Sequence, residues 1–308
     1  MSPVGSVDGF ESVTVTSSDG STEAEFVPAA GMVCCSLTHQ GVELLHTGAG
    51  VGAYAEHGKT MGVPLLHPWA NRLAGFRYRA AGRTVSLKRG DSRIPVDPGG
   101  LPIHGVLPGL LHWNVRPGGA PGRLTAVLDW SRGELLEVFP FPHQLSLEVT
   151  VGPGELALET TLRPTGEDPV PVSFGYHPYL IVPGTSRQAW RVKLGAFRRL
   201  LLDDRMIPTG EREPVQRRSF RLGEVGLDDG FDALSVPADF QVRSAGSTIV
   251  AEFRSGYAFA QVYAPRGEDY ICFEPMTAPT NALVSGDGLQ VVAPGEEHRA
   301  EFAIRLLT

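Results

Sequence analysis

The chain of 308 residues contains 42% hydrophobic and 20% charged residues, a composition that excludes a globally disordered protein and is typical of a globular one. Its 37 glycines and 25 prolines are too many for a helical bundle and favour many short strands joined by turns. The net charge of −7 argues against a nucleic-acid partner, which would require a strongly basic face.

Alternation of apolar and polar residues is the dominant pattern along the chain and predicts β-strands. In chain order, we expect strands at 12–16, 22–27, 32–38, 83–88, 124–130, 145–151, 156–162, 189–194, 248–254, 258–263, 270–274 and 302–306. Gly152-Pro153-Gly154 predicts a β-hairpin turn between two of them. Helices are expected to be nearly absent, with at most short turns near 105–110 and 221–226. The sequence therefore predicts an all-β fold, a large antiparallel β-sandwich forming a single domain over residues 1–308.

Cysteine usage and hydropathy indicate where the protein functions. Cys34, Cys35 and Cys272 lie in apolar runs and predict buried free thiols, because an odd count with two adjacent members is no disulfide framework. The N-terminus lacks a signal-peptide pattern, and no apolar run approaches the ~20 residues that cross a bilayer. We expect a cytoplasmic protein with no membrane partner. The one dense cationic stretch, 198–221, is interrupted by acidic residues and predicts a solvated loop region.

Two polar motifs in turn-rich segments could contact a ligand. Asn71 and Arg72 stand side by side, and their amide and guanidinium groups could hold the hydroxyls of a polyol. The alternative is a surface arginine beside a turn asparagine. His104 precedes Gly105, where the backbone can turn sharply, but by itself it favours a packing or surface histidine.

A histidine and a glutamate in apolar surroundings are candidates for acid–base chemistry. His177 is flanked by Tyr176 and, two residues on, Tyr179, so partial desolvation could tune its pKa for proton transfer. The alternative is a core histidine satisfied by a backbone partner. Glu274 ends an apolar strand, where a carboxylate is either paired with an arginine or held as a base with a raised pKa.

An acidic segment, 228–232, could present one carboxylate from a turn to a ligand hydroxyl. It lacks the spacing and terminal glutamate of an EF-hand, so a calcium site is disfavoured. The glycines of 48–52 are followed by neither a βαβ pattern nor a suitably placed P-loop lysine. We expect no metal and no cofactor.

Taken together, these motifs resemble the aldose 1-epimerase (galactose mutarotase) family over roughly residues 10–306. The segments that carry the resemblance, in order, are Pro68-Trp69-Ala70-Asn71-Arg72-Leu73, Gly75-Phe76, His104-Gly105, Phe139-Pro140-Phe141-Pro142, Gly175-Tyr176-His177-Pro178-Tyr179, Asp228-Asp229-Gly230-Phe231 and Phe273-Glu274-Pro275-Met276-Thr277. The resemblance implies a large antiparallel β-supersandwich and an enzyme that interconverts the α and β anomers of an aldose without a cofactor.

The resemblance also implies a role for each candidate residue. Glu274 would be the catalytic base, His177 the catalytic acid, and His104 an assisting histidine near the ring oxygen. Sugar binding would fall to Asn71, Arg72 and Asp228, with Asp229 in place of Asp228 if the alignment is shifted by one residue. The expected partner is a small-molecule sugar, an aldohexose such as glucose or galactose, bound by a monomer or homodimer.

Two other functions remain open from the sequence. A hexose-6-phosphate 1-epimerase of the same fold would need cations that converge on a phosphate, and Arg72, Arg77 and Arg79 lie close together in sequence. A non-catalytic carbohydrate-binding domain is the second alternative. It would have no need for both an acid and a base, the roles expected for His177 and Glu274.

Overall fold

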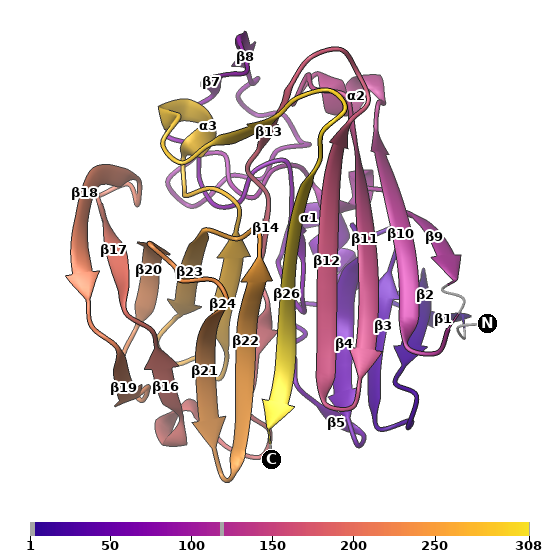
Figure 1. Cartoon of the computed structure of the whole chain (residues 1–308), viewed down its shortest axis with the longest axis vertical. Helices are drawn as coiled ribbons and strands as arrows, with labels where there is room; N and C mark the ends of the chain where they lie inside the picture. The colour runs from indigo at the N-terminus through magenta and orange to yellow at the C-terminus, as the bar shows by residue number, and fades with distance from the viewer. Residues whose placement is uncertain (1–3, 118–119, 308) are drawn as a thin grey trace.

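The computed structural model describes residues 4–117 and 120–307, which form antiparallel β-sheets with a few short helices (Figure 1). The largest sheet has nine strands, in the spatial order β19 (Arg218–Arg221), β16 (Arg191–Leu194), β21 (Ala238–Ser244), β22 (Ser247–Ser255), β26 (His298–Leu307), β12 (Glu155–Pro164), β11 (His143–Gly152), β10 (Arg123–Trp130) and β9 (Asn114–Pro117). The hairpin predicted around Gly152-Pro153-Gly154 is present, since β11 and β12 pair from Gly152↔Glu155 onward.

Two further sheets pack against this one. The N-terminal sheet consists of β1 (Val4–Val7), β2 (Phe10–Thr16), β3 (Thr22–Val27), β4 (Val33–His39) and β5 (Val42–Glu43). The other has eight strands, in the order β18 (Pro208–Val215), β17 (Phe197–Leu202), β20 (Leu227–Asp232), β23 (Phe259–Ala264), β24 (Ile271–Met276), β14 (Gly175–Tyr176) and β6 (Leu65–Leu66), with β15 (Tyr179–Leu180) also paired to β24.

The remaining elements are small. Two-stranded sheets are formed by β13 (Val170–Val172) with β25 (Gln290–Val292) and by β7 (Arg77–Ala80) with β8 (Arg83–Ser86). The helices are α1 (Val51–His57), α2 (Gly133–Leu136), α3 (Ala282–Ser285) and the 3-10 turns Pro108–Leu110 and Arg187–Ala189. Each predicted strand overlaps an observed strand, so the predicted all-β, antiparallel class is confirmed.

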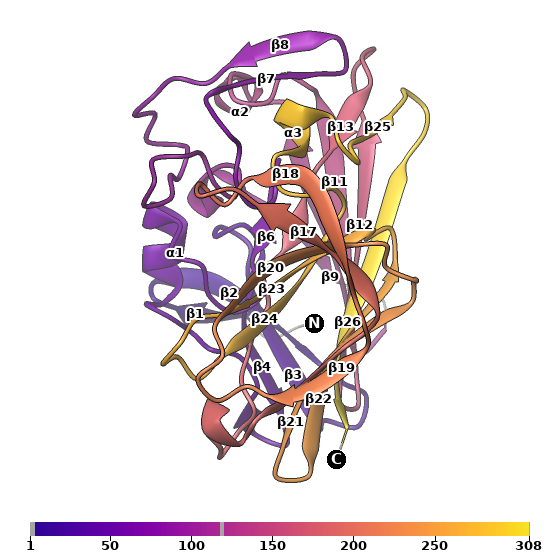
Figure 2. The same cartoon turned by 90° about the vertical axis from the view of Figure 1, so that its left-hand side faces the viewer.

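The core lies between the nine-stranded sheet and the two sheets behind it (Figures 1 and 2). Strand β11 contacts β2 and β3 of the N-terminal sheet. On the other half, Phe240 of β21 lies 5.6 Å from Phe273 of β24, measured between ring centroids. Neighbouring residues of a strand point to opposite faces of the sheet. Cys272 and Glu274, which precede and follow Phe273 in β24, therefore face away from this layer. That outward face carries the candidate site.

The helix predictions were only partly right. The 3-10 turn at 108–110 and a turn closed by the hydrogen bond from Val225 N to Leu222 O (2.8 Å) fall in the two expected segments, but α1 was missed. The reason is that α1 lacks a local capping residue: it starts after Gly50, and the carboxylate of Asp8 accepts hydrogen bonds from the backbone N–H groups of Val51 (2.7 Å) and Gly52 (3.4 Å). A cap supplied from 43 residues away leaves no signal in the neighbouring sequence.

Two other local predictions were wrong. The stretch 198–221 is not a loop but contains β17, β18 and β19, because its arginines are neutralised by distant acids: Arg198 and Arg212 both pair with Asp232. The acidic segment 228–232 belongs to strand β20 rather than to a turn.

The three cysteines are buried free thiols, as predicted. Across residues 4–117 and 120–307, no helix is both long and apolar enough to span a membrane.

Candidate active site

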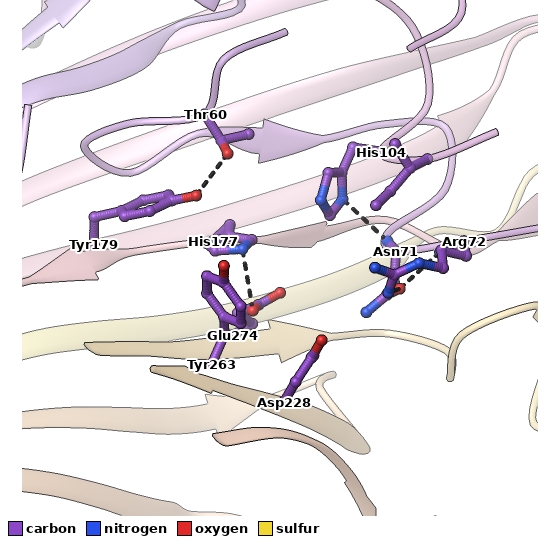
Figure 3. A pocket seen from close by; sticks show the side chains of 10 residues that line it. Thr60, Asn71, Arg72, His104, His177, Tyr179, Asp228, Tyr263 and Glu274 are labelled. Atoms are coloured by element: carbon purple, nitrogen blue, oxygen red, sulfur yellow. Dashed lines mark hydrogen bonds and ion pairs between the residues drawn. The ribbon is translucent and has the colours of Figure 1, made fainter. Parts of the chain in front are cut away.

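A pocket of about 180 Å³ lies on the outward face of the eight-stranded sheet (Figure 3). All six residues selected from the sequence line it, although Asn71 and Glu274 are 203 residues apart in the chain. Its lining consists of Thr60, Asn71, Arg72, Ile103, His104, His177, Tyr179, Asp228, Tyr263 and Glu274.

Strands β20, β23 and β24 form one wall of the pocket. Asp228 of β20 is paired in register with Tyr263 of β23, and Gln261 of β23 is paired with Glu274 of β24. These side chains therefore share one face of the sheet. The next residue, Asp229, points to the opposite face and forms an ion pair with Arg199 at 3.2 Å. Strand alternation thus places Asp228, and not Asp229, in the pocket.

Asp228 is held by a neighbour that the sequence analysis did not single out. Gln261 donates a hydrogen bond from its side-chain amide to Asp228 Oδ1 at 2.5 Å. Burial raises the pKa of Asp228, and the nearby Arg72 cation and this hydrogen bond partly offset the effect. A polar glutamine among the apolar residues of 258–263 was the signal available in the sequence.

His177 and Glu274 face each other at the centre of the pocket. His177 Nε2 lies 3.2 Å from Glu274 Oε1, and both side chains are almost fully buried. Among the described residues, the other two polar atoms of the pair, His177 Nδ1 and Glu274 Oε2, have no hydrogen-bond partner. Buried polar atoms without a partner are rare in proteins, and these two belong to residues that line the pocket, where a ligand could complete their hydrogen bonding.

Burial shifts the pKa values of this pair in opposite directions. It raises the pKa of Glu274 well above its ordinary value, helped by the nearby Asp228 carboxylate and opposed by Arg72. It lowers the pKa of His177 to about 3. Both shifts disfavour the charged forms and so favour a neutral pair that shares the proton between Oε1 and Nε2.

His104 lies against His177 at a right angle, with ring centroids 5.6 Å apart. Its Nδ1 accepts a hydrogen bond from the backbone N–H of Asn71 at 3.3 Å. Burial, followed by the neighbouring His177, lowers the pKa of His104, so the ring is neutral and its Nε2 carries the proton. His104 can therefore donate one hydrogen bond to a ligand oxygen.

Arg72 is fixed by two neighbours. Its Nε donates to Asp97 Oδ2 at 2.7 Å, and its Nη1 donates to Asn71 Oδ1 at 3.2 Å. Asp97 also accepts the backbone N–H of Leu101, which holds its carboxylate in place. The rest of the guanidinium and the amide nitrogen of Asn71 remain as donors toward the pocket.

The loops that carry these residues adopt a backbone conformation unusual outside glycine. Asn71 and His104 have φ values of 57° and 61° and are joined by a hydrogen bond from His104 N to Asn71 O. Asn281 (φ 71°) donates from its backbone N–H to Arg72 O. Gly105 could not be replaced, because an added Cβ would lie 2.0 Å from the carbonyl oxygen of His67. Strained backbone residues cluster at functional sites, which supports this pocket as the candidate site.

An aromatic ring and a hydroxyl complete the pocket. Tyr179 stacks on His177, with centroids 4.6 Å apart, and its hydroxyl lies 2.6 Å from Thr60 Oγ1. Tyr263 approaches His177 from another side. Thr60 follows a lysine in a loop and gave no signal in the sequence, whereas Tyr179 belongs to a motif already noted. Across residues 4–117 and 120–307, no three His, Cys, Asp or Glu side chains are grouped in a way that could hold a metal ion.

Comparison with known proteins places this chain in a family. The sequence model of the aldose 1-epimerase family matches residues 15–305. The protein YihR of Escherichia coli K12, which is uncharacterized, is 26% identical over 260 residues, covering 79% of this chain and 80% of YihR.

Solved structures show the same fold. A galactose mutarotase-like protein from Clostridium acetobutylicum superimposes with a TM-score of 0.85 at 18% identity, covering 100% of this chain and 98% of that one. A GalM/aldose epimerase homologue from C. elegans gives a TM-score of 0.77 at 16% identity, with 99% of each chain covered. Because the family match extends over nearly the whole chain, this protein belongs to the aldose 1-epimerase family.

Proposed function

We propose that the protein is an aldose 1-epimerase that interconverts the α and β anomers of a free aldohexose. The observation that carries this proposal is the buried contact of 3.2 Å between His177 and Glu274 in a pocket of small-molecule size. Enclosing an ionisable pair is costly, and binding a sugar does not require it. The pair therefore favours a catalyst over a non-catalytic carbohydrate-binding domain.

The reaction consists of two proton transfers and a bond rotation. With a sugar bound, the proton that the neutral pair shares moves from Glu274 to His177, and the reaction starts from this minor, ionised form. The Glu274 carboxylate then accepts the proton of the C1 hydroxyl while the His177 imidazolium donates a proton to the ring oxygen. The bond between C1 and the ring oxygen breaks, which leaves an open-chain aldehyde. Rotation about the C1–C2 bond presents the other face of the aldehyde, and the reverse transfers close the ring as the opposite anomer.

Burial supplies the driving force for ring opening. The ionised pair and the neutral pair contain the same number of protons, since a proton moves from His177 to Glu274 by way of the sugar. Because burial raises the pKa of Glu274 and lowers that of His177, the neutral pair is the more stable one. Ring opening thus removes two buried charges. Ring closure restores the ionised pair, which returns to its neutral form when the sugar leaves.

The remaining pocket residues position the sugar. The N–H of His104 can reach the ring oxygen region beside His177, given the 5.6 Å between their rings. Arg72, Asn71 and Asp228 would hold ring hydroxyls while C1 rotates. Their fixed geometry reduces the entropy lost on reaching the transition state.

The charge of the pocket supports a free sugar over a sugar phosphate. Within the described residues lining the pocket, Arg72 is the one arginine or lysine, and its Nε is already paired with Asp97. Arg77 and Arg79, the other cations considered for a phosphate, are exposed on β7 and do not line the pocket. A phosphate dianion would instead face the acidic side chains of Asp228 and Glu274.

Polarimetry of freshly dissolved α-D-glucose and α-D-galactose tests the proposal. We expect the purified protein to accelerate the decay of optical rotation, and Glu274→Gln and His177→Asn each to lower kcat by roughly 10²–10⁴-fold because each removes one proton transfer. Asp229→Asn serves as a folded control outside the pocket. Acceleration of glucose 6-phosphate alone would establish the sugar-phosphate alternative, and sugar binding without acceleration would establish the binding domain.

A further inference from the structure

We infer that a second hollow, formed by strands β16, β21 and β22 of the nine-stranded sheet, binds the phosphate group of a small phosphate ester. The hollow lies at the turn between β21 and β22, at the bottom of the molecule in Figure 1. Its volume is about 330 Å³, within the roughly 300–1,000 Å³ typical of small-molecule sites. This binding would be separate from the proposed function, since none of the described residues lines both the hollow and the catalytic pocket.

Three exposed arginines stand side by side at the hollow, on the outer face of the sheet. Arg191 of β16 is paired in register with Arg221 of β19 on one side and with Arg243 of β21 on the other. Val192 and Val242, which follow and precede two of them, are fully buried and face the core. Like charges directly opposite each other on neighbouring strands destabilise a sheet. The row of arginines is therefore unfavourable unless an anion lies against it.

Acidic side chains do not supply that anion. Across residues 4–117 and 120–307, no Asp or Glu pairs with an arginine of the row, whereas Arg254 of the same sheet pairs with Glu252 at 2.9 Å. Glu252 is in turn opposite Asp239, which lies four residues before Arg243 on β21 and therefore roughly 13 Å away along the strand. Glu224 accepts a hydrogen bond from the side chain of Gln188 at 2.6 Å. The positive charge of the row is thus left for a ligand.

The turn between β21 and β22 adds hydroxyl groups to one wall of the hollow. Its two central residues, Ala245 (φ 48°) and Gly246 (φ 87°), both have positive φ, as in the type I′ turns that match the twist of paired strands. Ser247 and Thr248 follow and line the hollow, and Thr248 is paired with Arg243. Guanidinium and hydroxyl donors therefore lie together on a turn of defined shape.

The opposite wall is the 3-10 turn Arg187–Ala189, whose last residue lines the hollow. The first residue of this turn is buried and donates hydrogen bonds from its guanidinium to the carbonyl groups of Gly223 (2.7 Å), Val225 (2.7 Å) and Glu268 (2.8 Å). Trp190, directly after the turn, is fully buried. Both walls are thus fixed before a ligand binds, which reduces the entropy lost on binding.

The chemistry of the lining indicates a phosphate ester. The planar guanidinium group matches the geometry of a phosphate and can donate two parallel hydrogen bonds to it. A phosphate monoester carries about −1.5 to −2 charges at neutral pH, so Arg191 and Arg243, the two arginines that line the hollow, balance it. The volume of the hollow leaves room for an organic group beside the phosphate.

Isothermal titration calorimetry at low ionic strength, run at two temperatures, tests the inference. The ligands are glycerol 3-phosphate, AMP, inorganic phosphate and, as a neutral control, glycerol. We expect at least one ester to bind with Kd below about 1 mM and more tightly than inorganic phosphate, and glycerol not to bind. Absence of binding by both esters would overturn the inference. Inorganic phosphate that binds as tightly as the better ester would overturn the assignment to an ester.

Variants of single arginines locate the ligand. Arg243→Gln and Arg191→Gln should each raise Kd for the better ester about tenfold or more, because each removes a charged donor. Arg116→Gln removes an exposed arginine from β9, at the other edge of the same sheet, with the same change in net charge, and should leave Kd within about twofold. Equal weakening by all three variants would show a general effect of net charge, and no weakening by the first two would place the ligand elsewhere. Either result would contradict the site.

Thermal unfolding separates a ligand-binding role of Arg243 from a structural one. Without ligand, Arg243→Gln should unfold at the same temperature as wild type or a higher one, because the substitution removes a pair of like charges. With the better ester at about ten times its Kd, the unfolding temperature of wild type should rise and that of the variant should not. A variant that unfolds at a lower temperature without ligand would assign Arg243 to structure and would overturn the inference.

Discussion

Glu274 is the residue at which the proposed function conflicts most directly with stability. Its side chain is 2% exposed, and one of its carboxylate oxygens has no hydrogen-bond partner among the described residues. Removing a carboxylate from water is costly unless the group is paired or protonated. In the proposed reaction this cost has a use, because a base of raised pKa at this position could exchange protons with a sugar hydroxyl.

This conflict predicts that Glu274→Gln stabilises the protein at neutral pH. The pKa of Glu274 is higher in the folded state than in the unfolded state. Below its unfolded-state pKa the carboxyl group does not lower the free energy of unfolding, and between the two pKa values it lowers that free energy more as pH rises. The variant should match wild type near pH 4 and exceed it at pH 7, with the gap growing by up to about 1.4 kcal/mol per pH unit. Urea denaturation of both proteins at each pH measures the gap. A gap independent of pH would contradict the raised pKa.

At the scale of the element, strand alternation selects the residues of the site. Along β20, Asp228 faces the pocket and hydrogen-bonds to Gln261, while Asp229 faces the other way and pairs with Arg199. The two aspartates are neighbours in sequence and have the same chemistry. Their different surroundings follow from the twofold repeat of an extended strand.

The two aspartates therefore form a matched pair of variants. Asp228→Asn should raise KM about tenfold or more, because a charged hydrogen-bond acceptor for the sugar is lost. Asp229→Asn should leave kcat and KM within about twofold of wild type, since its ion pair with the partly exposed Arg199 is worth little. Steady-state polarimetry of both variants shows which of the two aspartates contacts the sugar. A larger effect of Asp229→Asn would mean that β20 is shifted by one residue.

At the scale of the whole molecule, packing three sheets together encloses four histidines in their neutral forms. His67 and His143 form a buried pair, with Nε2 atoms 2.9 Å apart, behind the loop that carries Asn71. Since His143 Nδ1 donates to the carbonyl of Phe141, His143 Nε2 must accept the proton of His67. Burial lowers the pKa of His67, of His143 (to about 4) and of the two pocket histidines.

These histidines predict a loss of stability in mild acid. A folded pKa below the unfolded value of about 6.5 stabilises the protein fully above pH 6.5, and the contribution is lost as pH falls toward the folded pKa. Four such groups outweigh the opposite effect of Glu274, so the free energy of unfolding should fall by several kcal/mol between pH 7.5 and pH 5. The urea midpoint should fall with it. An unchanged or higher midpoint at pH 5 would show that these histidines are protonated in the folded protein.

Much of the fold could be predicted from the sequence, and the failures have a common cause. The strands of the hairpin at Gly152-Pro153-Gly154 were located correctly because alternation is a local property. The helix α1 was missed because its cap is Asp8, and strand β17 was missed because Arg198 is neutralised by Asp232, 34 residues away. In both places the stabilising group lies far away along the chain.

The sequence by itself determined the all-β class and, through the order of its motifs, the side chains to examine: Glu274, His177, His104, Asn71, Arg72 and Asp228. The tertiary structure decided that these residues share one pocket, that Asp97 holds Arg72, and that Arg191 and Arg243 line a second hollow. The physical reason is that alternation and turn chemistry act over a few residues. Burial, pKa and the distance between His177 and Glu274 depend instead on how segments distant in sequence pack together.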